Sequence, residues 1–151
     1  MHKIINSDSG IYLLEIYAAI KFKIDIKRYS HIIFPPGYYY YTGSAQKNLL
    51  KRIERHCSKS KTIHWNIDHI TDNKNTKVTR VFIFKDSAKS FECELTNILH
   101  NSLKLAFSVR GFGNSDCNTC TSHLLYHSAR LDEHELISSS IINQQPIIEV
   151  F

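Results

Sequence analysis

Residues 37–56 read GYYYYTGSAQKNLLKRIERH and combine aromatic side chains with groups that can act on a phosphate. Arg52 and His56 are spaced one helical turn apart in this stretch. A guanidinium pairs with phosphate oxygens in a fork geometry that lysine cannot supply. An imidazole can accept a proton from water or donate one to a leaving oxygen. The residue types and their spacing predict chemistry on a phosphate group.

A carboxylate that could bind a metal ion is found in the segment Glu92-Cys93-Glu94, which opens a predicted helix. A carboxylate can hold Mg²⁺ or Mn²⁺ and leave positions open for water and phosphate oxygens. Glu92 and Glu94 lie on different faces of that helix, so they compete for this role.

Basic residues follow the tyrosines directly, in a chain of net charge +5. We interpret five side chains as contacts to nucleic acid: Lys47, Lys51, Arg55, Lys59 and His64. The alternative is a solvated helix face, which is the usual role of a charge run. Trp65 could stack on a base of single-stranded nucleic acid, but a core anchor is the favoured interpretation.

Two of the four cysteines have informative spacing, in the pattern Cys117-x-x-Cys120-x-x-His123. These ligand types suit Zn²⁺, and His127 could complete a set of four. A zinc finger usually separates its two ligand pairs by a longer loop. The favoured interpretation is therefore a glycine-enabled loop packed near the sheet, with the thiols as small buried side chains, and structural Zn²⁺ is the alternative.

The periodicity of the sequence predicts several strands, two longer helices and a compact tail. Strands are expected at residues 11–17, 21–27, 38–42, 78–84 and 122–126, with an extended piece at 31–34. Helices are expected at residues 47–58, 88–105 and 129–137. Alternation along the tyrosine strand sends Tyr39 and Tyr41 to one face and Tyr38 and Tyr40 to the other.

This order predicts an α/β (α+β) sandwich with a small, mainly antiparallel central sheet flanked by helices. We expect one domain over residues 1–151, with a core at about 9–105 and a C-terminal extension at about 106–151 packed on it. No apolar run approaches the roughly 20 residues that cross a bilayer. The N-terminus lacks the apolar stretch of a signal peptide, so a cytoplasmic location without membrane contact is expected.

The triplets Gly10-Ile11-Tyr12 and Tyr41-Thr42-Gly43 resemble the two motifs of the GIY-YIG nuclease superfamily, with Thr42 replacing the usual Ile or Val. The helix with Arg52 and His56 and the segment at 92–94 occur in the order found in that family, and the resemblance covers residues 10 to about 103. The long separation of the two motifs implies an inserted β-hairpin. The segments PPGYYYYTGSA, HWNIDHI, ECEL and GFGNSDC…SHLLY resemble a poorly characterised subfamily. Its members occur alone or, in some archaea, fused to a base-excision DNA glycosylase.

The resemblance implies a DNA endonuclease that uses one Mg²⁺ or Mn²⁺ ion per active site. It implies catalytic roles for five residues: Tyr12, Tyr41, Arg52, His56 and Glu94. Of the two glutamates, Glu94 is expected to bind the metal, because its spacing to Ile98 is closer to the family pattern than that of Glu92. The alternatives are a non-catalytic nucleic-acid-binding module, an RNA-directed nuclease and an enzyme for single-stranded or branched DNA. The chain could act as a monomer or as a homodimer.

Overall fold

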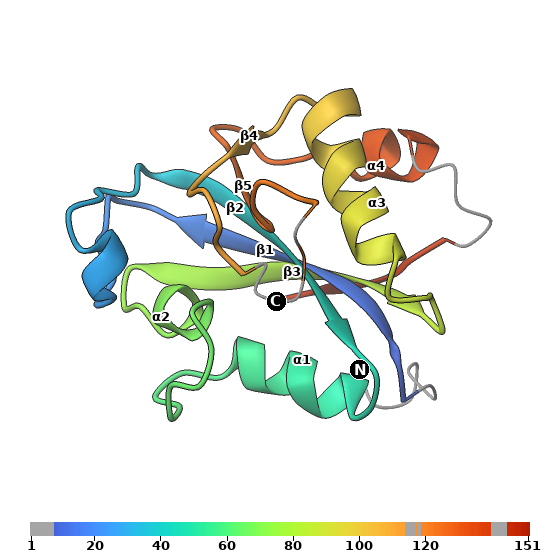
Figure 1. The fold of residues 1–151 in the computed structure, drawn as a ribbon, viewed down its shortest axis with the longest axis horizontal. Helices are drawn as coiled ribbons and strands as arrows, with labels where there is room; N and C mark the ends of the chain where they lie inside the picture. Colours follow the sequence, from blue (N-terminus) through green and yellow to red (C-terminus); the bar gives the residue numbers. More distant parts are fainter. Residues whose placement is uncertain (1–7, 114–116, 118, 140–144) are drawn as a thin grey trace.

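The computed structural model describes residues 8–113, 117, 119–139 and 145–151. Within these ranges, six strands form one antiparallel sheet in the order β4-β5-β2-β1-β3-β6. The sheet runs through the middle of the molecule with helices on both faces (Figure 1). The predicted α+β sandwich is therefore confirmed. None of the helices in these ranges has the length and apolar character needed to span a bilayer.

The central strand β1 (Gly10–Ala18) is flanked by β2 (Gly37–Ala45) and β3 (Thr76–Lys85). All three are rich in aliphatic or aromatic residues, which suit a pleated surface buried on both faces. The register places Tyr12 opposite Gly43. A Cβ atom at Gly43 would lie 2.5 Å from the Tyr12 ring, so the glycine makes room for that side chain.

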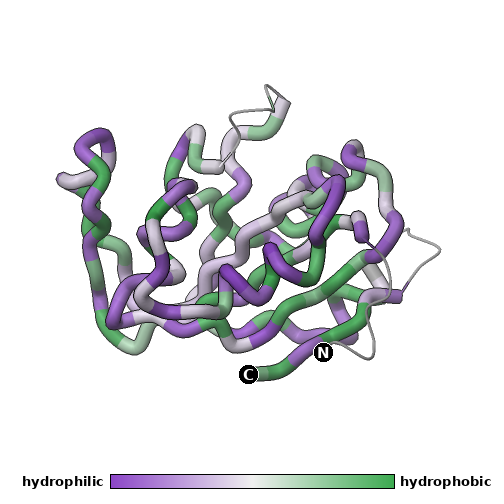
Figure 2. The backbone as a smooth tube through the Cα atoms, turned by 90° about the horizontal axis from the view of Figure 1, so that it is seen from below, coloured by the Kyte–Doolittle hydropathy of each residue, from purple (hydrophilic) through white to green (hydrophobic). Residues whose placement is uncertain are grey.

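The two faces of the sheet carry separate cores, and the tyrosines of β2 divide between them as predicted. Tyr39 and Tyr41 pack with Tyr12, whereas Tyr38 and Tyr40 pack on the opposite face. The helices α1 (Leu49–Cys57) and α2 (Asp68–Thr71) cover the Tyr12 face. Figure 2, seen from that side, shows hydrophobic and hydrophilic residues alternating along α1. This is the amphipathic pattern that buries one stripe of a helix against a sheet.

The opposite face is covered by α3 (Phe91–Asn97), the π-helical turn η2 (Ile98–Ser102) and α4 (Glu133–Ser139). The predicted helix at 88–105 therefore starts three residues later than expected, and it changes from an α-helix to a π-helical turn after Asn97. Short strands β4 (Ala106–Phe107) and β5 (Leu124–His127) extend the sheet beside β2, and β6 (Ile147–Val150) extends it beside β3. The C-terminal residues thus supply strands at both edges of the sheet.

The strand predicted at 21–27 is wrong, and these residues form no hairpin with β1. Both edges of β1 are already paired with β2 and β3, so no edge remains for it. The insert instead folds back on itself through a single bridge between Phe22 and Phe34, and contains the 3₁₀ turn η1 (Lys27–Tyr29). The alternation of buried and exposed residues that suggested a strand does occur. Phe22 and Ile24 are buried, and Lys21 and Lys23 are exposed.

Candidate active site

A cavity of about 590 Å³ lies at the C-terminal half of β2. Strand β5 pairs with β2 from Tyr38 to Tyr41, and the N–H group of Thr42 donates to the carbonyl oxygen of His123. Within the described ranges, residues 43–45 of β2 have no strand partner on that side. Glu92 of α3 and Arg52 and His56 of α1 line the cavity, and the two helices cover opposite faces of the sheet. The cavity is lined by residues from all of these segments, among them Tyr12, Tyr41, Lys47, Arg52, His56, Trp65, Lys89, Glu92, Cys117 and His123.

The hydroxyl of Tyr12 and Nε2 of His56 form a hydrogen bond of 2.9 Å between β1 and the last turn of α1. Burial, with the positive charge of Lys61 nearby, lowers the pKa of His56 to about 3. Burial and the neighbouring Tyr41 raise the pKa of Tyr12 well above 10. Both side chains are therefore neutral at physiological pH. Nδ1 of His56 is buried and has no hydrogen-bond partner among the described residues.

Arg52 lies one turn before His56 on α1 and lines the cavity. Its Nη1 donates a hydrogen bond of 2.6 Å to the carbonyl oxygen of Ser44, which fixes the guanidinium beside the end of β2. No carboxylate in the described part of the chain forms an ion pair with it. The arginine therefore keeps its positive charge for an anion in the cavity.

Tyr41 lines the cavity beside His56, with ring centroids 6.4 Å apart. Its ring packs on Gly113, where a Cβ atom would lie 2.6 Å away. Gly113 has a φ of 73°, a conformation that favours glycine. The glycine-rich loop thus packs against the sheet at this tyrosine, as expected. Burial and the nearby carboxylate of Glu92 raise the pKa of Tyr41, so its phenol stays protonated.

The carboxylate that reaches the cavity is that of Glu92, and the predicted metal ligand Glu94 does not reach it. Glu94 is exposed, two residues further along α3 and about 200° around the helix. Burial raises the pKa of Glu92, while His123 and Lys89 act in the opposite direction. Oε1 of Glu92 lies 3.7 Å from Nδ1 of His123.

Two residues predicted to bind nucleic acid make contacts inside the protein instead. Arg55 donates hydrogen bonds of 2.7 and 2.8 Å to the buried carboxylate of Asp68. Nζ of Lys59 donates to three backbone carbonyls, those of Thr71, Asn73 and Thr76. A contact to nucleic acid requires a charged group that is free to bind phosphate. The charged groups of Arg55 and Lys59 instead hold the segment after α1, so these two predictions are wrong.

The other three predicted contacts remain exposed. Lys47 lines the cavity, whereas Lys51 lies on α1 and His64 lies beside Trp65, and neither lines it. Lys89, which the sequence did not single out, brings another positive charge to the cavity.

The interpretation of Trp65 as a core anchor is wrong, because its side chain is 42% exposed and lines the cavity. Backbone N–H groups of His64 and Trp65 both donate 2.9 Å hydrogen bonds to Asp68, which holds the loop in place. The guanidinium carbon of Arg52 lies 5.0 Å from the centre of the indole ring. The partly solvent-exposed indole ring of Trp65 therefore lies beside the guanidinium group of Arg52 in the cavity.

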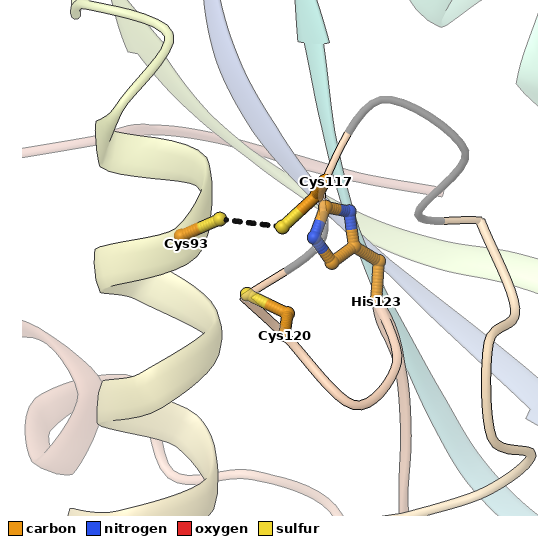
Figure 3. Close-up of side chains that lie close together, drawn as sticks. All are labelled: Cys93, Cys117, Cys120 and His123. Atoms are coloured by element: carbon orange, nitrogen blue, oxygen red, sulfur yellow. Dashed lines mark hydrogen bonds between the residues drawn. The ribbon is translucent and has the colours of Figure 1, made fainter.

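Next to the cavity, Cys93, Cys117, Cys120 and His123 bring their ligand atoms within 4.8 Å of one another (Figure 3). The sulfur atoms of Cys93 and Cys117 are 3.0 Å apart. This set can hold one metal ion. The expected fourth ligand, His127, is instead engaged with the backbone of Ala129. Cys93 replaces it from α3, a segment distant in the sequence.

A family described as a domain of unknown function, DUF123, matches residues 11–145 of this 151-residue chain. The matched range begins in β1 and ends beyond α4, so it includes every residue of the cavity and of the neighbouring metal-ligand set. No curated protein and no solved structure matches the chain. Because the match covers most of its length, the chain belongs to the DUF123 family.

Proposed function

We propose that this protein is a divalent-metal-dependent endonuclease that hydrolyses phosphodiester bonds in DNA. The observation that carries the proposal is the meeting of Tyr12, Arg52, His56 and Glu92 in one cavity, although they come from β1, α1 and α3. Phosphodiester hydrolysis can use a proton-transfer pair, a carboxylate and a guanidinium that forms no ion pair among the described residues. The resemblance to GIY-YIG nucleases supports the same reaction.

Arg52 binds a non-bridging oxygen of the scissile phosphate, and Lys47 and Lys89 contact neighbouring phosphates of the strand. All three cations line the cavity beside the exposed ring of Trp65. Guanidinium groups form charge-assisted hydrogen bonds with phosphate and stabilise the charge that develops on it. The arrangement favours a polyanionic strand over a small neutral substrate.

Glu92 would hold one Mg²⁺ or Mn²⁺ ion. The residues fit such an ion, because Mg²⁺ commonly uses one or two carboxylates and completes its shell with water and substrate phosphate. Glu92 is a half-buried carboxylate that lines the cavity, and burial raises its pKa. When bound, the metal neutralises phosphate charge and lowers the pKa of water.

Tyr12 and His56 move the proton of the attacking water. His56 is neutral, and in the tautomer with unprotonated Nε2 it accepts the hydrogen bond of the Tyr12 hydroxyl. The oxygen of Tyr12 then offers a lone pair to a water molecule in the cavity. As that water attacks phosphorus, its proton passes to Tyr12 while the phenolic proton passes to His56, the bond from phosphorus to the leaving oxygen breaks, and the leaving oxygen takes up a proton from solvent. The relay gives Tyr12 a role in catalysis despite its raised pKa.

The test is a cleavage assay with plasmid, single-stranded DNA and RNA, in Mg²⁺, in Mn²⁺ and in EDTA. Glu92→Gln and Arg52→Ala should each reduce metal-dependent cleavage by about 100-fold or more. Glu94→Gln is the matched control on the same helix and should cut at the wild-type rate. Loss of cleavage in Glu94→Gln together with full activity in Glu92→Gln would reverse the assignment of the carboxylate.

The same assay separates the alternatives. A wild-type protein that binds DNA in a salt-dependent manner, but cuts no substrate with either metal, would be a binding module. Cleavage of RNA alone would make it an RNA-directed nuclease. Either outcome would contradict the proposed DNA endonuclease.

A further inference from the structure

We propose that Cys93, Cys117, Cys120 and His123 bind one Zn²⁺ ion in a closed four-ligand site. The ion would join the first turn of α3 to the loop that leads into β5. It would thereby hold Glu92 at the cavity. The zinc site stands on its own geometry, whereas the role given to Glu92 rests on the proposed function.

The four ligand atoms lie close enough for one ion. All of them fall within 4.8 Å of one another. A tetrahedral zinc ion with Zn–S bonds of about 2.3 Å places its sulfur ligands about 4 Å apart, which is inside this limit. An iron–sulfur cluster contains several metal atoms and needs its cysteines spread further. The compact set therefore favours a single ion.

His123 supplies an observation that is independent of the thiols. Its side chain is 1% exposed, and neither ring nitrogen has a hydrogen-bond partner among the described residues. Buried polar atoms without partners are uncommon in proteins and call for an explanation. Figure 3 shows one edge of the ring directed toward the thiols. A metal ion there would satisfy the ring nitrogen on that edge.

The other ring nitrogen faces the cavity carboxylate. Nδ1 of His123 lies 3.7 Å from Oε1 of Glu92, which leaves Nε2 for the metal. Histidines bound to zinc commonly donate their second N–H group to a carboxylate, and this fixes the ring. Cys93, the residue after Glu92, is itself a ligand. Two ligands of the ion therefore lie next to Glu92. Cys93 follows it on α3, and His123 faces its carboxylate.

The ligand types select zinc rather than the ion of the proposed active site. Three thiols and an imidazole suit Zn²⁺, whereas Mg²⁺ and Mn²⁺ prefer oxygen ligands. Four protein ligands fill a tetrahedral shell and leave no position for a substrate water, which is typical of structural zinc. The ligands come from α3 and from a loop 24 residues later, so the ion would cross-link two segments.

The first experiment measures metal in the full chain, purified without a histidine tag. We expect about one zinc per chain by elemental analysis. Replacement by Co²⁺ should give the thiolate charge-transfer and tetrahedral d–d absorption bands. Cys120→Ser should lower the zinc content at least about tenfold at limiting zinc, because a thiolate ligand is lost. Cys57→Ser is the matched control, since Cys57 lies on α1 outside the set.

Wild-type protein that neither contains zinc nor takes up Zn²⁺ or Co²⁺ would overturn the site, and so would stoichiometric iron. If Cys120→Ser does not fold, wild-type protein is stripped with a chelator and reloaded. Recovery of the Co²⁺ bands on reloading supports the site, and failure to recover them in protein that is still folded contradicts it.

The second experiment tests the position of Glu92 without measuring cleavage. Mn²⁺ binding is followed by the electron paramagnetic resonance signal of the free ion, in zinc-loaded and zinc-free folded protein. Removal of zinc should weaken Mn²⁺ binding about tenfold or more, the scale found when partners of a metal ligand are lost. Equal Mn²⁺ affinity in both forms would contradict the positioning role. Absence of Mn²⁺ binding in zinc-loaded protein would instead contradict the proposed function and leave the zinc site intact.

Discussion

The hydrogen bond between Tyr12 and His56 lies in a wall of the cavity where both side chains are almost completely covered. Burial penalises the charged form of each group, so the pair is held neutral over a wide range of pH. A neutral imidazole can accept a proton, and a neutral phenol can pass one on. At the scale of single residues, packing therefore sets the protonation state of the pair, and the proposed proton relay starts from two neutral groups.

Burial of His56 predicts a pH-dependent cost to stability. Its pKa falls from 6.5 to about 3 on folding. Between these values the unfolded chain binds a proton that the folded chain excludes. The free energy of unfolding should therefore decrease as the pH falls below 6.5. His56→Gln retains a hydrogen-bond acceptor for Tyr12 and removes the titrating group, so its decrease should be smaller.

Urea unfolding followed by circular dichroism, at about pH 7.5 and about pH 4.5, measures this difference. His31→Gln is the matched control because His31 is exposed, and it should behave as the wild type. Equal pH dependence in wild type and His56→Gln would mean that His56 is not held neutral by the fold.

Among the site residues, the structure brings together Tyr12, Tyr41, Arg52 and His56, all of which the sequence had indicated. Their positions depend on strand alternation and on one helical turn, which are local patterns. The choice between Glu92 and Glu94 depends on where α3 begins and how it is rotated against the sheet, and packing decides this. Cys93 was missed as a ligand because a set drawn from distant segments has no fixed spacing.

At the scale of elements, the segment between α1 and α2 is held by charged side chains that turn inward. Asp68 accepts hydrogen bonds from Arg55 and from two backbone N–H groups. These contacts set the position of Trp65 beside α1. Positive charges that follow the tyrosines in sequence therefore include side chains that hold the fold, such as Arg55 and Lys59, and side chains that line the cavity, such as Lys47 and Arg52.

Lys47 and Lys59 provide a test of this division. Lys59→Met removes a donor to three carbonyls and should lower the free energy of unfolding by about 1–2 kcal/mol, with little effect on DNA affinity. Lys47→Met removes an exposed charge from the cavity and should leave stability unchanged. It should also reduce the salt slope of DNA binding by about 0.7–0.9.

Urea unfolding and a salt titration of oligonucleotide binding, carried out on both variants, measure the two quantities. If Lys59→Met weakens binding and spares stability, the inward contacts of Lys59 do not describe the protein in solution.

The sequence predicted the strands that are rich in apolar, aromatic or β-branched residues, namely β1, β2 and β3. It misassigned residues 21–27 because alternation reports burial of one face and not strand pairing, and the edges of β1 were already occupied. Strand β6 has partly exposed residues and only four positions, so its pattern is too short to identify without its partner β3. Pairing partners are a property of the whole sheet and cannot be read from one segment.

Over the whole molecule, a net charge of +5 attracts a polyanion without selecting where it binds. In the proposed complex with nucleic acid, the cavity would determine the binding position, since Lys47, Arg52 and Lys89 line it together with the exposed Trp65. A strand that follows these cations would bring a base onto the indole ring. Because the chain contains one tryptophan, its fluorescence reports on this place alone.

Titration with a short single-stranded oligonucleotide, in EDTA to prevent cleavage, should quench the fluorescence of Trp65. Three cations imply a slope of about −2 for the logarithm of affinity against the logarithm of salt concentration. An abasic strand of equal length keeps the phosphates and lacks the bases. Stacking on the indole ring is worth about 1–3 kcal/mol per base, so the abasic strand should bind about 5- to 150-fold more weakly. Equal affinity for both strands would show that Trp65 makes no contact with a base, and binding without quenching would place the nucleic acid outside the cavity.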